Sequence, residues 1–163
     1  MFYTARKRNR LMAYDYSSPG AYFITICTLN KQCFLSRISV GATTGRPPKV
    51  HLTDCGNAVE QAIITIPKKY PAVVVDSYCI MPNHVHLLIR ICSTADGRPM
   101  VAPTVSTIIQ QMKGAAVKAA GKSFWQKSFH DHIIRDENDY QKIWEYIEAN
   151  PFKWSDDCFY VPE

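Results

Sequence analysis

The sequence lacks several features that would place it in a membrane or a secreted framework. No apolar run reaches the roughly 18 residues that a membrane-spanning helix needs. The opening stretch, MFYTARKRNRLMAYDYSS, has no apolar core of the kind found in secretory signals. The six cysteines are scattered and form no Cys-x-x-Cys pair, and several lie in apolar runs where a reduced cysteine acts as a small hydrophobic residue. We therefore expect a cytoplasmic protein that does not enter a membrane.

Internal repeats and low-complexity tracts are also missing. Hydrophobic residues make up 47% and charged residues 20% of the 163 positions, which is typical of a globular chain rather than a disordered one. The Gly/Pro/Thr-rich stretches at 41–49 and 93–104 are predicted to be loops, each too short to separate two domains. We expect a single domain over residues 1–163, with a basic N-terminal segment over residues 1–20.

Positive charge is present and unevenly distributed. The formal net charge is +5, and one basic cluster near the start of the chain consists of Arg6, Lys7, Arg8 and Arg10. Tyrosines lie close to this cluster in the sequence. Cations beside aromatic rings suit single-stranded nucleic acid, because phosphates need positive charge and unstacked bases need flat π faces. A solvated basic terminus is the alternative reading of the same cluster.

Hydrophobic periodicity predicts strands in pairs that alternate with helices. The expected strands are 22–29, 31–38, 73–80, 84–91 and 129–135. The expected helices are 53–68, with Thr53 as N-cap, 105–120 and 139–150, with Pro151 ending the last one. Hairpins that alternate with helices indicate an α+β fold. We expect an antiparallel sheet with helices mainly on one face, in a ferredoxin-like topology.

The tripeptide His84-Val85-His86 is the first candidate for chemistry. On a strand, residues two apart point to the same face and are roughly 6.5–7 Å apart, so both imidazoles can converge on one ion while Val85 packs on the other side. The pair follows a predicted turn and lies in an apolar run, where polar side chains need partners. A structural or surface-exposed pair is the alternative.

The last predicted helix carries the second candidate. Tyr146 and Asn150 are four residues apart, so they share one face of a helix. Together with Ile143 and Ile147 they also follow the spacing of a buried stripe. The alternative is therefore that Tyr146 packs in the core and Asn150 ends the helix before Pro151.

Three ordered segments, YCIMPNHVHLLI (78–89), FWQKSFHDHIIRDENDY (124–140) and EYIEANPFKW (145–154), resemble the REP-associated tyrosine transposases. This is a branch of the single-tyrosine HUH transposases of the insertion-sequence-200 type, and RKRNRLMAYDYSSPGAYFITICT (6–28) is similar to the same branch. The resemblance covers most of the chain except the two predicted loops. It implies the HUH endonuclease topology, with metal ligands at His84, His86 and Asn150 and a nucleophile at Tyr146.

The resemblance also implies an activity and a partner. A tyrosine hydroxyl with a pKa near 10 is a poor nucleophile, and a divalent cation, Mg²⁺ or Mn²⁺ in this family, favours the phenolate. Attack on single-stranded or hairpin-forming DNA would give a 5′-phosphotyrosine link and a free 3′-hydroxyl, and the reverse reaction would join strands. We expect phosphate contacts from Arg135 and Lys153 as well as from the N-terminal basic cluster, although both side chains could instead be solvated.

Several alternatives stay open at the level of sequence. A rolling-circle replication initiator or relaxase-type nickase would use the same chemistry, and a catalytically silent ferredoxin-like domain could bind nucleic acid without cutting it. The protein could act as a monomer or a homodimer. In a dimer, Tyr146 could serve the histidines of either chain, depending on the path of the segment before the last helix.

Overall fold

The computed structural model describes residues 14–39, 47–93 and 103–161, so the N-terminal basic cluster lies outside the described residues. Four strands form an antiparallel sheet in the spatial order β4-β5-β1-β6. Their bounds are β1 (Gly20–Cys27), β4 (Val73–Ile80), β5 (His84–Ile91) and β6 (His130–Ile134). The pairing leaves β5 and β1 in the middle of the sheet, where each has a neighbour on both sides.

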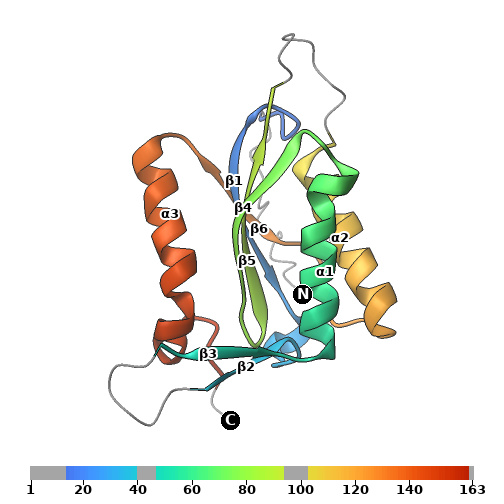
Figure 1. The fold of residues 1–163 in the computed structure, drawn as a ribbon, viewed down its shortest axis with the longest axis vertical. Helices are drawn as coiled ribbons and strands as arrows, with labels where there is room; N and C mark the ends of the chain where they lie inside the picture. The colour runs from blue at the N-terminus through green and yellow to red at the C-terminus, as the bar shows by residue number, and fades with distance from the viewer. Residues whose placement is uncertain (1–13, 40–46, 94–102, 162–163) are drawn as a thin grey trace, which may run out of the picture.

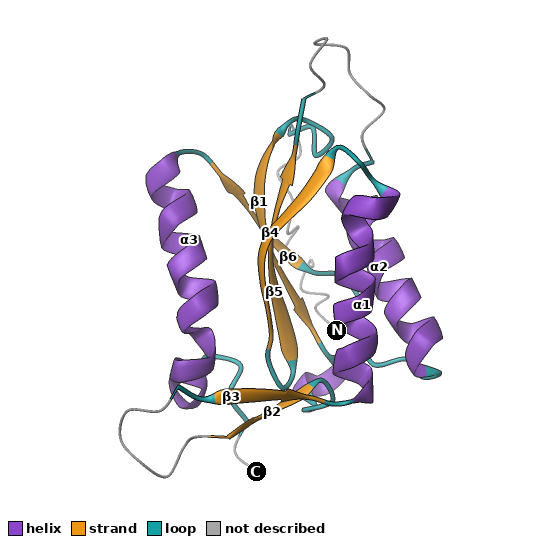
Figure 2. Cartoon of the chain, viewed as in Figure 1, coloured by secondary structure: helices purple, strands orange, loops and turns teal. Residues whose placement is uncertain are grey.

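Three α-helices accompany the sheet: α1 (Asp54–Lys69), α2 (Val105–Ala120) and α3 (Glu137–Ala149). The chain order β1-α1-β4-β5-α2-β6 with this strand order is the ferredoxin-like arrangement. The predicted α+β class and topology are therefore confirmed. In Figures 1 and 2, α1 and α2 lie side by side on one face of the sheet, and α3 covers the opposite face.

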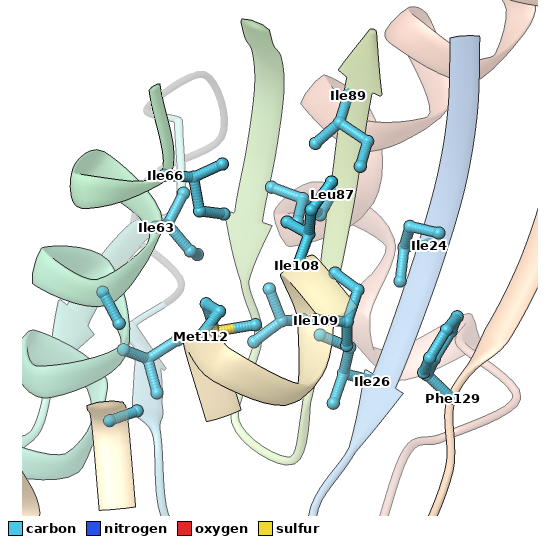
Figure 3. Packing of buried hydrophobic residues seen from close by; sticks show 14 of the residues in the cluster. Ile24, Ile26, Ile63, Ile66, Leu87, Ile89, Ile108, Ile109, Met112 and Phe129 are labelled. Atoms are coloured by element: carbon cyan, nitrogen blue, oxygen red, sulfur yellow. The ribbon is translucent and has the colours of Figure 1, made fainter. Parts of the chain in front are cut away.

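The main core lies between the sheet and the pair α1/α2. Leu87 and Ile89 of β5 point into it together with Ile24 and Ile26 of β1 (Figure 3). From the helices it receives side chains that are likewise buried: Ile63, Ile66, Ile108, Ile109 and Met112. Because successive side chains of a strand point to opposite faces, this packing turns the even-numbered residues of β5 towards α3.

Helix α1 begins as the sequence predicts. The Thr53 hydroxyl oxygen accepts the backbone N–H of Gly56, which is an N-cap bond, and the same hydroxyl contacts the carbonyl oxygen of Leu35 at 3.0 Å. A Cβ on Gly56 would overlap the Leu35 carbonyl oxygen. Only glycine allows the helix to approach the preceding segment this closely.

The prediction of a strand over residues 31–38 that returns along the first strand is wrong. Both sides of β1 are occupied by β5 and β6, so no place is left in the main sheet. The chain instead turns through a short 3-10 helix, in which Asn30 and Lys31 have positive φ. It then forms β2 (Ser36–Ser39), which pairs with β3 (Lys49–Leu52) in a separate two-stranded sheet.

The last helix also ends differently from the prediction. Helix α3 stops at Ala149, and Asn150 begins a 3-10 helix, Asn150–Asp156, with Pro151 in its first turn. At the other end, only Arg135 and Asp136 separate β6 from α3, and the Asp136 side chain caps α3 by accepting the backbone N–H of Asp139 at 2.8 Å. Among the described residues, no helix is long and apolar enough to cross a membrane.

Candidate active site

Two histidines of β5 meet on the face of the sheet that α3 covers. His84 and His86 are 0% and 2% exposed, and their Nε2 atoms are 3.1 Å apart. The tight turn before β5 is closed by the Met81 N–H, which donates to the carbonyl oxygen of His84 at 2.9 Å. The two imidazoles thus point to the same side of the strand and converge, as their spacing predicts.

Asn83 determines which nitrogen of His84 carries the proton. Its Nδ2 donates to two backbone carbonyl oxygens, of Lys31 at 3.1 Å and of Phe159 at 2.7 Å. The amide orientation is therefore defined, and Oδ1 is left to accept from His84 Nδ1 at 2.9 Å. With its proton on Nδ1, the neutral His84 ring presents a lone pair at Nε2.

His86 has a more adaptable partner. Its Nδ1 lies 2.9 Å from Thr25 Oγ1, and a hydroxyl can both donate and accept. Since His84 Nε2 has no proton, the 3.1 Å contact between the two Nε2 atoms requires His86 Nε2 to donate and His86 Nδ1 to accept from Thr25. If a cation took the place of that proton, Thr25 could accept from Nδ1 instead, and both Nε2 lone pairs would be available.

Burial keeps both rings neutral at physiological pH. It lowers the pKa of His84 and of His86 to about 3, and for His86 the nearby His84 contributes in the same direction. The Asn150 side chain opposes the effect at His84. Neutral imidazoles are the form that binds metal ions, so the pair does not need to lose protons to solvent before it can act as a ligand pair.

Tyr146 of α3 contacts His86 from the face of the sheet that α3 covers. Its hydroxyl oxygen lies 3.4 Å from His86 Nε2, and its ring packs edge-on against His86 and Phe23. The residue remains 42% exposed and lines a surface cleft, so part of its side chain is open to solvent. Burial of part of the ring raises the pKa of Tyr146, the negative charge of Asp157 raises it further, and Asn150 opposes both.

Asn150 lies one helical turn after Tyr146 and is 3% exposed. Its Oδ1 is buried and has no hydrogen-bond partner among the described residues. An unsatisfied buried carbonyl oxygen typically costs about 1–3 kcal/mol. The same side chain interacts with both neighbours, since it raises the pKa of His84 and lowers the pKa of Tyr146, and its oxygen could serve as a further ligand for a cation.

Sequence reasoning missed a carboxylate at the same place. The Asp157 side chain is 4% exposed, and its Oδ2 lies 3.9 Å from His84 Nε2. The ligand atoms of His84, His86 and Asp157 all lie within 4.8 Å of one another, a grouping that could hold a metal ion. Asp157 is the second of two adjacent aspartates after an aromatic segment, and nothing local distinguishes it from a solvated acidic residue.

The structure places the two remaining predicted DNA contacts, Lys153 and Arg135, at opposite ends of α3. Lys153 lines a cleft of about 590 Å³ together with Tyr146 and Lys142, so it lies beside the candidate nucleophile. Arg135 precedes α3 and lines a separate polar cavity of about 450 Å³ with Arg90, at the opposite end of that helix. The structure therefore brings Lys153 to the site and leaves Arg135 away from it.

Comparison with known proteins identifies the class to which this arrangement belongs. The family described as Transposase IS200 like matches residues 43–150. The match includes β5 and the whole of α3, and it ends at Asn150. The chain belongs to the IS200-like transposase family.

Individual relatives indicate the branch within this family. A Haemophilus influenzae protein of uncharacterised function is 35% identical, over 96% of this chain and 93% of the relative. A second protein of that organism, provisionally named a REP-associated tyrosine transposase, is 26% identical over 85% of this chain and 74% of its own length. The structure of a REP-associated tyrosine transposase bound to a REP hairpin shares the fold, with a TM-score of 0.59 and 23% identity over 82% of this chain and 67% of that one. The predicted resemblance to the REP-associated tyrosine transposases is confirmed by these matches.

Proposed function

We propose that the protein is a transposase that cuts and rejoins single-stranded, hairpin-forming DNA through a 5′-phosphotyrosine intermediate. The observation that carries this proposal is the 3.4 Å approach of the Tyr146 hydroxyl to His86 Nε2, which joins a nucleophile to a buried pair of imidazoles within one chain. Family membership supports an enzyme of the DNA-cleaving and strand-transferring kind. The hairpin in the related structure suggests the substrate class.

The residues present fit a divalent cation. His84 and His86 can both offer an Nε2 lone pair, and the unpaired Oδ1 of Asn150 offers a hard oxygen donor beside them. Mg²⁺ or Mn²⁺ is proposed from the family resemblance. When bound, such a cation would polarise the scissile phosphate and favour the phenolate of a nearby tyrosine.

The chain's own part in the reaction follows from the position of Tyr146. Its hydroxyl oxygen would attack the phosphorus of a phosphodiester as the phenolic proton is lost. The bond from phosphorus to the 3′-oxygen would break, and that oxygen would leave as a hydroxyl after taking up a proton. The new phosphotyrosyl ester keeps the phosphate activated, so a different 3′-hydroxyl can displace the tyrosine and join two strands without ATP.

Substrate access agrees with this scheme. The cleft beside Tyr146 is lined by Lys142 and Lys153, whose ammonium groups can bind the phosphates on either side of the scissile one. We propose additional phosphate contacts from Arg135 and from the N-terminal basic cluster, which would extend the footprint beyond the cleft. All of these contacts position the strand and carry no sequence information by themselves.

The direct test is covalent capture of DNA. Wild type, Tyr146→Phe and the matched control Tyr140→Phe, which changes another tyrosine of α3, are incubated with Mn²⁺ and end-labelled single-stranded hairpins, then separated on a denaturing gel. We expect a protein–DNA adduct with wild type and Tyr140→Phe and none with Tyr146→Phe. An adduct in Tyr146→Phe would refute the nucleophile. Hairpin binding by wild type without any adduct would favour a catalytically silent binding domain.

A further inference from the structure

The segment that follows the 3-10 helix Asn150–Asp156 folds back over the histidine pair. The ring of Phe159 lies 4.6 Å from the ring of His84, and the Phe159 carbonyl oxygen accepts from Asn83 Nδ2 at 2.7 Å. Lys31 Nζ donates to the carbonyl oxygen of Cys158 at 3.3 Å and lies 5.3 Å from the Phe159 ring centroid. The segment is therefore held at several points, although it lies beyond residue 150, where the family match ends.

Because the segment is held in this way, the two oxygens of the Asp157 carboxylate lie in different surroundings. Oδ1 accepts the backbone N–H of Phe159 at 2.7 Å, which fixes the side-chain conformation. Oδ2 faces His84 Nε2 at 3.9 Å, a separation too long for a hydrogen bond. The nitrogen that it faces is the lone-pair end of His84, as the bond from Asn83 requires.

The carboxylate oxygen and the lone-pair nitrogen are thus two electron-rich atoms that lie 3.9 Å apart. Among the described residues, His84 is the one side chain within ion-pair distance of Asp157. A buried carboxylate is costly unless it is paired, hydrogen-bonded or bound to a metal ion. Here Oδ1 accepts from the backbone, and the carboxylate also belongs to a group with His84 and His86 whose ligand atoms all lie within 4.8 Å of one another.

We infer that Asp157 supplies an anionic ligand to the divalent-cation site of the proposed function. The donor set then consists of two imidazole nitrogens, one amide oxygen and one carboxylate oxygen. The inference rests on the proposed metal site and extends it with a residue outside the family match. Carboxylates favour hard ions such as Mg²⁺ and Mn²⁺, whereas imidazoles alone favour Zn²⁺ and softer ions. Asp157 would therefore determine which metal the site prefers as well as how tightly it binds.

Metal titration of the full chain tests this inference without using catalysis. Wild type, Asp157→Asn and Asp156→Asn are freed of metal and titrated with Mn²⁺, and separately with Zn²⁺, in a calorimeter. Asp157→Asn retains an oxygen that can accept the backbone N–H of Phe159, so this hydrogen bond within the segment is preserved. Asp156 is the exposed neighbour of the same charge and is the matched control. Thermal unfolding of the metal-free proteins checks that each variant is folded.

We expect Asp157→Asn to weaken Mn²⁺ binding about tenfold or more, with a smaller loss for Zn²⁺, and Asp156→Asn to bind both ions as wild type does. A variant that merely unfolds would lose both ions together. Equal Mn²⁺ affinity of wild type and Asp157→Asn would overturn this inference alone. Absence of Mn²⁺ binding by wild type would overturn the inference together with the metal in the proposed function.

Discussion

We expect the buried histidine pair to make the stability of the fold sensitive to mild acid. Burial places the pKa of His84 and His86 at about 3 in the folded chain, against about 6.5 in an unfolded one. Between these values the unfolded chain binds protons that the folded chain does not, so the free energy of unfolding falls as the pH falls. It levels off above about pH 6.5, where neither state is protonated.

The size of the effect follows from the same two values. Each histidine contributes about 1.4 kcal/mol per pH unit in this window. The pair therefore removes roughly 2–3 kcal/mol between pH 6 and pH 5, a large part of the about 5–15 kcal/mol by which domains are usually stable. The measurement is urea unfolding of the metal-free protein at pH 7, 6 and 5.

A variant isolates the histidines from other titrating groups. In His86→Asn an amide can replace Nδ1 as the partner of Thr25, yet it binds no proton. We expect the loss of stability per pH unit to be smaller than in wild type by about 1.4 kcal/mol. His51→Asn, which changes an exposed histidine of β3, is measured beside it as the matched control. Equal slopes for wild type and His86→Asn between pH 6 and pH 5 would refute the reasoning.

Three further predictions concern the helices and the surroundings of the histidines. Gly114 lies inside α2, and a Cβ added there would have no neighbouring atom within 4 Å, so Gly114→Ala should raise the free energy of unfolding in urea by about 0.5–1 kcal/mol. Gly56→Ala, which would meet the Leu35 carbonyl, should lower it by about 1–3 kcal/mol, and a gain there would contradict the close approach. Thr25→Val removes the hydroxyl that orients His86, so calorimetry should show Mn²⁺ affinity reduced about 10–100-fold. Unchanged affinity would mean that Thr25 does not support the ligand.

The elements built from continuous apolar runs could be predicted from sequence. The run 84–91 is bounded by a turn and is long enough for one strand, and the observed β5 has the predicted bounds. Because side chains alternate along a strand, His84 and His86 lie on the same face of β5 whichever strands pair with it. The same reasoning could not find the pairing of β2 with β3, because it depends on both sides of β1 being occupied by strands from later in the chain.

The chemistry around the histidines depends on contacts that no local pattern contains. The proton position on His84 is determined by Asn83, whose amide is oriented by carbonyl oxygens of Lys31 and Phe159, 52 and 76 residues away. Asp157 reaches the site only because the chain turns back after the 3-10 helix. Sequence spacing can relate residues on one strand or one helix turn, as it does for Tyr146 and Asn150. It cannot relate a strand end to a distant segment.

The short connection between β6 and α3 limits how far the start of that helix can lie from the sheet. The step from Ile134 to Glu137 passes through only two residues, so it spans at most about 11 Å when fully extended. The start of α3 therefore stays close to the end of β6, and in this structure Tyr146 faces histidines of its own chain. A single molecule of this structure thus holds the tyrosine and both histidines of the candidate site.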